Sequence, residues 1–324
     1  MPKKSSTIFI TGIAGFIGYH LALFLQQRGD DVMGCDNFNS YYTPFLKKKR
    51  AEKLREKGIA VKQCDINKIE TLKPLFEKKQ FSHLVHLAAQ AGVRYCLENP
   101  LVYADANLTG FLHVLEMCRL FHLKLIFASS SSVYGDCKEG PCCEEDQTDA
   151  PISLYAATKK GGEMMAKSYH HLYQIPMVIL RYFTVYGPWG RPDMAYFSFA
   201  ESILHNKTIS LFNHGDMQRD FTYIDDIVRG TAAALDYCAH YDIFNLGNHQ
   251  PKPISELISL LEDSLKKKAI IDLKPMQKGD VKMTFANIGR AREKLGYCPE
   301  VSLSSGIGKF SLWFQNEWST RLKA

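Results

Sequence analysis

Short apolar runs alternate with longer amphipathic stretches through the first half of the chain, and this alternation limits the fold more than any other feature. The candidate strands are Ile8–Thr11, Asp31–Cys35, Ala60–Cys64, His83–Leu87, Lys124–Ala128 and Met177–Arg181. The candidate helices between them are Phe16–Arg28, Pro44–Lys57, Ile69–Lys79, Pro100–Phe121 and Leu154–Tyr173. Strands separated by helices of this length form right-handed βαβ units. We therefore expect an α/β fold built on a doubly wound parallel sheet.

The pattern changes after Arg181. A loop rich in glycine and proline covers residues 186–194, and less regular segments follow it. Later candidates are helices over 223–237, 254–267 and 303–316 and a short strand over 243–246. We interpret residues 1–182 as a dinucleotide-binding domain and residues 183–324 as a smaller α/β lobe that closes over it. The boundary is approximate, because some of the chain is expected to cross back between the two.

Composition places the chain among globular proteins without membrane spans. It has 324 residues, of which 46% are hydrophobic and 23% charged, and no apolar run reaches the length of about 18 that a membrane span needs. The polar start, Met1–Ser6, lacks the apolar core of a signal peptide. The nine cysteines are scattered without a C-x-x-C pair, and the cluster of Cys137, Cys142 and Cys143 has no histidine nearby. We expect reduced thiols, no metal site and a cytoplasmic location.

The charge pattern does not suggest nucleic-acid binding. The net charge is +6, and the main basic run, residues 47–50, is followed by alternating charges. We interpret this run as a solvated helix face, since aromatic residues are not interleaved with it. A mild basic excess equally suits anionic small molecules.

A glycine-rich turn joins the first strand to the first helix. Gly12, Gly15 and Gly18 have G-x-x-G-x-x-G spacing, and Phe16 and Ile17 begin the helix. Glycines allow a tight turn and close approach of the backbone, so that a pyrophosphate can lie on the helix N-terminus. Such a turn can also be purely structural, but an acidic residue after the second strand favours the dinucleotide site.

That acidic residue is Asp36, which is followed by Asn37. A carboxylate here accepts hydrogen bonds from the ribose hydroxyls and repels a 2′-phosphate, so NAD is expected rather than NADP. Further cofactor contacts are expected where later strands end. These candidates are Asp65, Ile66, Leu87, Ala88, Ala89 and Gln90.

Tyr155 and Lys159 are spaced i, i+4 and therefore share one face of a helix. A free tyrosine has a pKa of about 10 and is a poor base at neutral pH. A nearby ammonium and the positive charge of an oxidised nicotinamide would lower the pKa of the tyrosine, so that the phenolate could take a proton from a substrate hydroxyl. Alone, this pair is also compatible with a solvated helix face.

Taken in order, the glycines, Asp36, a serine run at 129–132 and the Tyr155/Lys159 pair resemble the extended short-chain dehydrogenases that modify nucleotide sugars. The resemblance covers nearly the whole chain and implies a Rossmann-type fold with NAD as cofactor. In that family a Ser or Thr stands three positions before a V-Y-G triplet and completes the catalytic set. Here the triplet begins at Val133, which implies that Ser130 takes this role.

Neighbouring residues indicate the group within the family. Sugar 4,6-dehydratases carry Asp and Glu at the positions of Ser131 and Ser132, and UDP-xylose synthases usually keep the Glu. Galactose epimerases carry Asn at the position of Thr184. The run V-Y-G-P-W-G-R-P-D-M-A over 185–195 resembles UDP-glucuronate 4-epimerases. This resemblance implies a sugar-carboxylate pocket made by Ser131, Ser132, Thr184 and Arg191.

The diphosphate of a UDP-sugar substrate also needs positive partners. Arg219, in the segment 215–221, matches the family segment that binds it. Related epimerases often place a second arginine just before a G-D pair, whereas here Lys278 precedes Gly279 and Asp280. Whether Lys278 supplies the second charge stays open, and Asp280 is taken as part of the substrate site.

The implied reaction is a transient oxidation at sugar carbon 4, with Tyr155 as base and acid and NAD regenerated in each cycle. The resemblance also implies a homodimer, formed through the helices over 100–121 and 154–173. Alternatives are a UDP-glucose or UDP-N-acetylglucosamine 4-epimerase, less favourably a UDP-glucuronate decarboxylase, and a non-catalytic NAD-binding protein.

Overall fold

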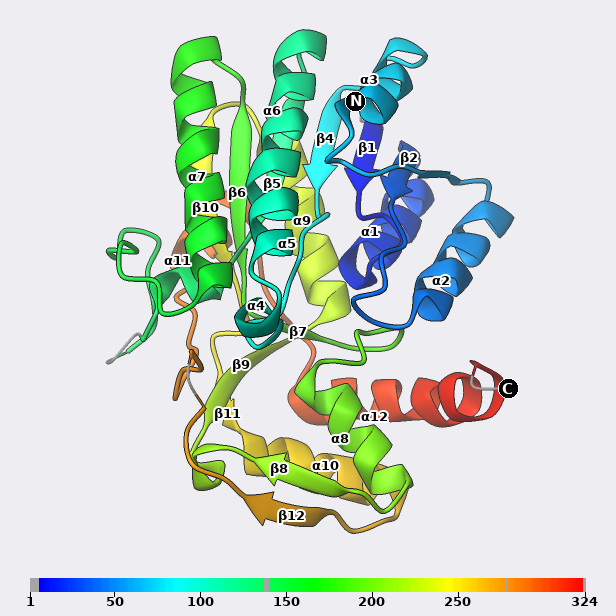
Figure 1. Cartoon of the computed structure of the whole chain (residues 1–324), viewed down its shortest axis with the longest axis vertical. Coiled ribbons are helices and arrows are strands. Elements are labelled where there is room, and N and C mark those ends of the chain that lie inside the picture. Colours follow the sequence, from blue (N-terminus) through cyan, green and yellow to red (C-terminus); the bar gives the residue numbers. More distant parts are fainter. Residues whose placement is uncertain (1–5, 137–139, 278, 323–324) are drawn as a thin grey trace.

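Seven parallel strands form the main sheet, in the order β10-β6-β5-β4-β1-β2-β3 (Figure 1). The computed structural model describes residues 6–136, 140–277 and 279–322. The strands are β1 (Thr7–Thr11), β2 (Asp31–Asp36), β3 (Ala60–Gln63), β4 (His83–His86), β5 (Lys124–Ser130), β6 (Met177–Tyr182) and β10 (Tyr241–Leu246). The strand order reverses between β1 and β4, and such a reversal opens a crevice at the carboxyl ends of the strands. The predicted doubly wound parallel sheet is confirmed.

Helices cover both faces of this sheet (Figure 1). One face carries α3 (Ile69–Glu77), α6 (Gly110–Phe121) and α7 (Leu154–Tyr173), and the other carries α1 (Phe16–Gln27), α2 (Pro44–Glu56) and α9 (Ile224–Tyr237). Residues alternate between the two faces along each strand. In β1, Ile8 and Ile10 join the core that contains α1 and α9, whereas Phe9 joins the core that contains α3 and α6. Both faces are apolar because both are covered.

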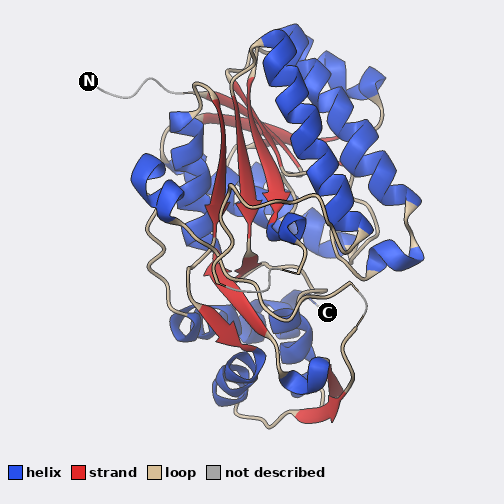
Figure 2. Cartoon of the chain, turned by 90° about the vertical axis from the view of Figure 1, so that its left-hand side faces the viewer, coloured by secondary structure: helices blue, strands red, loops and turns tan. Residues whose placement is uncertain are grey.

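The second lobe lies below the carboxyl ends of the main strands (Figures 1 and 2). Its sheets are β11-β9-β7 and β12-β8, made by β7 (Thr184–Tyr186), β8 (Thr208–Leu211), β9 (Gln218–Tyr223), β11 (Pro251–Pro253) and β12 (Ile270–Leu273). Its helices are α8 (Ala195–Leu204), α10 (Ile254–Leu265) and α12 (Leu303–Trp313). The chain returns to the main sheet in α9, β10 and the short helix α11 (Gly289–Leu295).

The helix predicted over residues 100–121 is confirmed, and a π-helical turn interrupts its regular geometry. After α4 (Tyr95–Glu98), α5 (Leu101–Ala104) leads into a π-helical turn (Asp105–Thr109) before α6 begins. The turn directs the buried side chain of Asn107 to the loop after β4, where its Oδ1 accepts from the Gln90 N–H at 2.9 Å and its Nδ2 donates to the Gln90 carbonyl at 3.0 Å. Pairing this buried backbone compensates for the irregular turn.

The interpretation of residues 47–50 as a solvated helix face is wrong for two of its members. Lys47 is 5% exposed and Arg50 is fully buried within α2. Both lie on the side of α2 that packs against the rest of the chain, because they share a helix face with Leu46 and Leu54.

The helix predicted over 303–316 is present as α12. It continues beyond Trp313 as a π-helical segment, Phe314–Leu322. Within the described residues, none of the helices combines the length and apolar character that a membrane crossing requires.

Candidate active site

A cavity of about 760 Å³ lies between the carboxyl ends of the main strands and the second lobe. All but one of the predicted site residues line it. They are Gly12, Gly15, Phe16, Ile17, Gly18, Asp36, Asn37, Asp65, Ile66, Leu87, Ala88, Ala89, Ser130, Ser131, Ser132, Tyr155, Lys159, Thr184, Arg191, Arg219 and Asp280. Gln90 is the exception, because it is buried against Asn107 behind the cavity wall. Residues far apart in sequence are thus brought together at the place that the strand order predicts.

The glycine-rich turn is packed against neighbouring backbone too closely for side chains at Gly12 and Gly18. Gly12 has a φ of +71°, and a Cβ there would lie 2.8 Å from the Ala88 nitrogen. A Cβ on Gly18 would lie 2.3 Å from the Gly12 carbonyl oxygen. Gly15 is the N-cap residue of α1, and the first turn of that helix has no acidic residue. The positive end of the helix therefore faces the cavity unopposed, as a pyrophosphate site requires.

Asp36 lies at the end of β2, beside this turn. Its carboxylate is 8% exposed and accepts a hydrogen bond from the Phe38 N–H at 2.9 Å. Burial raises the pKa of Asp36, while that hydrogen bond and the nearby charges of Lys47 and Arg50 oppose the shift. Asn37 donates to Asp65 at 3.3 Å, which joins the ends of β2 and β3. The donors and the carboxylate present here fit a dinucleotide that has a free 2′-hydroxyl.

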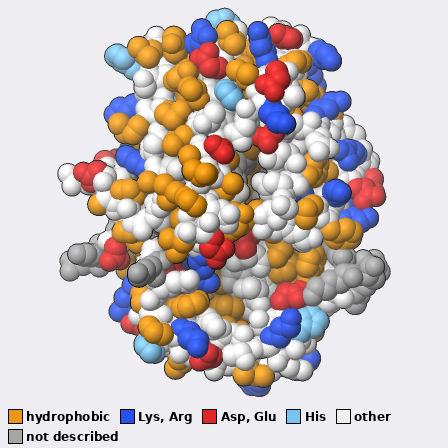
Figure 3. Space-filling model, viewed as in Figure 1, with side chains coloured by type: hydrophobic (Ala, Val, Ile, Leu, Met, Phe, Trp, Pro, Cys, Tyr) orange, Lys and Arg blue, Asp and Glu red, His pale blue; other side chains and the backbone are white. Residues whose placement is uncertain are grey.

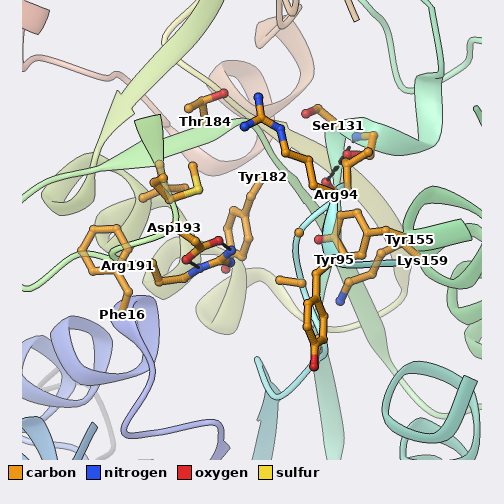
Figure 4. A pocket seen from close by; sticks show the side chains of 18 of the residues that line it. Phe16, Arg94, Tyr95, Ser131, Tyr155, Lys159, Tyr182, Thr184, Arg191 and Asp193 are labelled. Carbon is orange, nitrogen blue, oxygen red and sulfur yellow. Dashed lines mark hydrogen bonds and ion pairs between the residues drawn. The ribbon is translucent and has the colours of Figure 1, made fainter. Parts of the chain in front are cut away.

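Tyr155 and Lys159 project side by side from α7, which Ser153 caps by accepting from the Ala156 N–H (Figure 4). The Lys159 ammonium is 4% exposed and donates to the Ala128 carbonyl at 2.7 Å. Burial lowers the pKa of Lys159 to about 7, although the carboxylate of Glu163 opposes this change.

Burial also raises the pKa of the Tyr155 phenol, against a hydrogen bond with Ser130 and the charge of Arg191. The cation that opposes this rise in the pKa of Tyr155 is Arg191. Ser130 accepts from the Ser132 N–H at 3.2 Å and donates to the Ser132 hydroxyl at the same distance. The serine run thus forms one short hydroxyl chain beside Tyr155.

Arg191 and Asp193 lie against each other at the cavity (Figure 4). Its Nε lies 3.1 Å from Asp193 Oδ1, and its Nη2 bonds the other carboxylate oxygen. Tyr41 donates to the same carboxylate at 3.0 Å. Asp193 and Tyr41 were not predicted as site residues. The spacing of Asp193, two residues after an arginine, could have marked it, whereas nothing in the sequence connects Tyr41 to this loop.

A second cluster of charged side chains lines the cavity and consists of Arg219, Asp280 and Arg94. Arg219 Nη2 lies 2.7 Å from Asp280 Oδ1, and Arg94 Nη2 lies 3.9 Å from Asp280 Oδ2. Arg94 also stacks over the Phe212 ring at 4.6 Å. Arg94 was not predicted, although its place after β4, at the same edge as the other site residues, is a usable signal. Lys278, the earlier candidate for the second cation, lies outside the described residues.

The cysteines in the described part of the chain form no disulfide bonds. In the same part, His, Cys, Asp and Glu side chains nowhere gather in a group of three that could hold a metal ion. Cys137, a member of the predicted cysteine cluster, lies outside the described residues.

Comparison with known proteins assigns the family. Residues 8–247 match the NAD dependent epimerase/dehydratase family. The chain belongs to this family. UDP-glucuronate 4-epimerase 4 of Arabidopsis thaliana is 49% identical over 98% of this chain and 77% of its own length. Protein CapI of Staphylococcus aureus is 41% identical over 95% of this chain and 98% of its own length.

Solved epimerase structures have the same fold. The UDP-glucuronic acid 4-epimerase of Bacillus cereus, in complex with UDP-glucuronic acid and NAD, has a TM-score of 0.90 and 36% identity over 95% of this chain and 99% of its own. A UDP-glucose 4-epimerase of Thermus thermophilus in complex with NAD has a TM-score of 0.87 and 28% identity over 96% of this chain and 99% of its own. The predicted family resemblance is confirmed.

Proposed function

We propose that this protein is an NAD-dependent epimerase that interconverts UDP-glucuronate and UDP-galacturonate at sugar carbon 4. One observation carries the proposal: a chain 49% identical to a UDP-glucuronate 4-epimerase keeps Ser130, Tyr155 and Lys159 on one cavity. Serine at 131 and 132 fits an epimerase better than a dehydratase, because a hydroxyl cannot replace a carboxylate as the acid or base of an elimination.

The cofactor is NAD, held by the glycine-rich turn and by Asp36. The N-terminus of α1 would bind the pyrophosphate, and the Asp36 carboxylate would accept from the ribose hydroxyls. When bound, NAD supplies the acceptor that takes hydride from carbon 4 and returns it to the opposite face of the sugar. Because no net oxidation occurs, the cofactor stays with the protein through each cycle.

Tyr155 is the proton-transferring group. Its phenolate takes the proton of the sugar 4-hydroxyl and later returns a proton to the keto oxygen. Ser130 hydrogen-bonds the same sugar oxygen and aligns it with the phenol. Lys159, with its pKa lowered to about 7, is protonated part of the time at neutral pH, and its charge then favours the phenolate.

The sugar carboxylate is bound by Ser131, Ser132, Thr184 and Arg191. A 4-keto uronic acid is a β-keto acid, and such acids lose carbon dioxide when the breaking bond aligns with the ketone. Charge-assisted hydrogen bonds that hold the carboxylate out of that alignment suppress the loss.

The diphosphate is bound by Arg219 and Arg94, with Asp280 between them to orient both guanidinium groups. We assign cofactor binding to the domain formed by residues 1–182 together with α9 and β10. We assign binding of the sugar nucleotide to the rest of residues 183–324.

A second copy of the chain packs on α5, α6 and α7. Figure 3 shows hydrophobic side chains gathered over this part of the surface. Those that are exposed include Leu101 (76%), Leu112 (40%), Met164 (56%) and Leu172 (62%). Helices that present such a face can bury it against the same face of a partner. Sedimentation should give a dimer, and Leu172→Glu with Met164→Glu should give a monomer; a wild-type monomer at micromolar concentration would reject this interface.

The absence of disulfide bonds among the described residues fits a reducing compartment, and we place the reaction in the cytoplasm. The test of function is to supply UDP-glucuronate, UDP-glucose and UDP-N-acetylglucosamine separately and to resolve the products by chromatography. Conversion of the uronate at a higher kcat/KM than the neutral sugars is expected. Conversion of UDP-glucose alone would replace the proposal with a UDP-glucose 4-epimerase.

A further inference from the structure

Arg50 is a fully buried cation in the middle of α2. Among the described residues it forms no ion pair, which is unusual for a charge removed from water. Its guanidinium instead saturates all of its donors. Nε and Nη2 donate to the Trp189 carbonyl, Nη2 also to the Gly190 carbonyl at 2.9 Å, and Nη1 to the Ala14 carbonyl at 3.1 Å and the Tyr42 hydroxyl at 2.8 Å.

The backbone acceptors belong to two segments whose neighbouring residues, Gly15 and Arg191, line the cavity. Ala14 lies within the glycine-rich turn that forms the cofactor cradle. Trp189 and Gly190 lie in the loop between β7 and α8, which runs beneath α1 and α2 (Figure 1). The next residue of that loop is Arg191, whose guanidinium lines the cavity. One rigid planar side chain therefore connects the cofactor turn to the loop that carries the substrate cation.

The loop has a conformation that needs such support. Trp189 has a φ of +59°, which is rare for a residue with a side chain. A Cβ on Gly190 would lie 1.7 Å from the Tyr196 hydroxyl oxygen, so the loop backbone is packed directly against α8. His20 of α1 bonds the Pro188 carbonyl at 2.9 Å. Backbone in such a conformation persists only when its surroundings hold it, and it is concentrated at functional sites.

We infer that Arg50 is a positioning residue that fixes loop 187–191 against the cofactor turn and thereby sets where Arg191 meets the substrate. Only a guanidinium reaches all of these acceptors at once, because its donors diverge in one plane whereas those of an ammonium share one atom. This inference rests on the proposed function for its kinetic consequence but not for its structural one. Ser130, Tyr155 and Lys159 lie on β5 and α7, away from Arg50, so their arrangement stays intact when the loop shifts.

The test compares Arg50→Lys and Arg50→Met with wild type and with Arg55→Lys. Arg55 is a matched control, since it lies on the same helix and donates to a backbone carbonyl, that of Val61, at 3.1 Å. The purified proteins are compared by far-UV circular dichroism, thermal midpoint, bound NAD, and kcat and KM for UDP-glucuronate. Near-UV circular dichroism adds a direct readout of the loop, because the rings of Trp189 and Trp313 lie 5.3 Å apart.

Arg50→Lys is expected to fold, to lose near-UV signal and to lower kcat/KM by at least about tenfold, as expected when a positioning contact slips. Most of this loss should be a rise in KM. Arg50→Met should also lose bound NAD, and if it fails to fold, Arg50→Lys carries the test. Arg55→Lys should match wild type throughout. A folded Arg50→Lys with wild-type kcat, KM and near-UV spectrum, and only a lower thermal midpoint, would overturn the inference.

Failure of the proposed function gives a different result. Wild-type protein that is inactive on UDP-glucuronate would reject that function. The inference would then be decided by the near-UV spectrum of Arg50→Lys, and a spectrum equal to that of wild type would count against it.

Discussion

The guanidinium of Arg191 is held by the carboxylate of Asp193, two residues farther along the same loop, with Nε 3.1 Å from Oδ1. Burial acts to raise the pKa of Asp193, but the charge of Arg191 outweighs it and holds that pKa below its usual range. Asp193 therefore stays ionised at neutral pH and fixes the direction of the arginine. The cation proposed to bind a sugar carboxylate is oriented in advance, which reduces the entropy lost on binding.

Asp193→Asn should release Arg191 from this orientation. We expect the fraction of decarboxylated ketopentose product to rise several-fold. Arg191→Ala, which removes the guanidinium, should raise this fraction further, because Asp193→Asn leaves part of the hydrogen bonding in place. Product ratios by chromatography measure the effect. Asp216→Asn, in an exposed ion pair with Lys282, is the control and should leave the ratio unchanged. Equal product ratios in Asp193→Asn and wild type would count against the role of the pair.

Ser132→Glu should also shift the outcome toward decarboxylation. A carboxylate at this position would repel the sugar carboxylate and displace it from Arg191. The expected result is a lower kcat/KM for epimerisation and a larger share of ketopentose. Ser132→Gln, with nearly the same shape and no charge, separates repulsion from bulk. If both variants give the same product ratio, charge is not the reason for serine at this position.

Tyr155→Phe should keep the fold and the bound cofactor and lose turnover. Removal of a general base typically lowers the rate by about 10²–10⁴-fold. Tyr169→Phe is the control, since this tyrosine lies on the same helix and donates to Glu116 at 2.7 Å outside the cavity. The initial rate with UDP-glucuronate and the absorbance of bound NAD provide the measurement. Residual turnover within tenfold of wild type would remove Tyr155 from its role.

His20 should make stability sensitive to acid. Burial lowers the pKa of His20 to about 4 from its ordinary value of 6.5, while the hydrogen bond to the Pro188 carbonyl opposes this. Between these values the unfolded chain binds the proton more readily, so stability is lost as pH falls from 6.5 toward 4. We expect wild type to lose on the order of 2 kcal/mol relative to His20→Gln across this range.

Urea unfolding of both proteins at several pH values measures this difference. A constant gap between wild type and His20→Gln from pH 6.5 to 4 would show that the histidine does not titrate as described.

Local sequence patterns predicted those parts of the fold that are determined by residues close to one another in the sequence. The strand and helix periodicity indicated the sheet, and the Gly12–Gly18 spacing indicated the cofactor turn, because both signals are contained within single βα units. The return of β10 to the edge of the main sheet is one placement that a local signal cannot define, since its pairing with β6 joins residues 241–246 to residues 177–182.

The missed site residues have the same cause. Arg50 resembles a surface arginine when its helix is read alone, because its acceptors, Ala14 and Trp189, lie far away in the chain. Tyr41 contacts Asp193 only in the folded chain, because 152 positions separate the two residues in sequence. By contrast, a family motif was enough to predict Ser130, Tyr155 and Lys159. Members of a family that share such a motif also share the arrangement of its residues in space. Their roles as catalytic residues stay a prediction.

The proposed mechanism requires that hydride leaves sugar carbon 4 and returns to the same carbon inside one closed cavity. The decisive experiment incubates UDP-glucuronate labelled with deuterium at carbon 4 with purified protein and no added NAD. The expected product is UDP-galacturonate that retains the deuterium at carbon 4. Loss of the label to solvent, or no conversion until NAD is supplied in stoichiometric amounts, would contradict the mechanism.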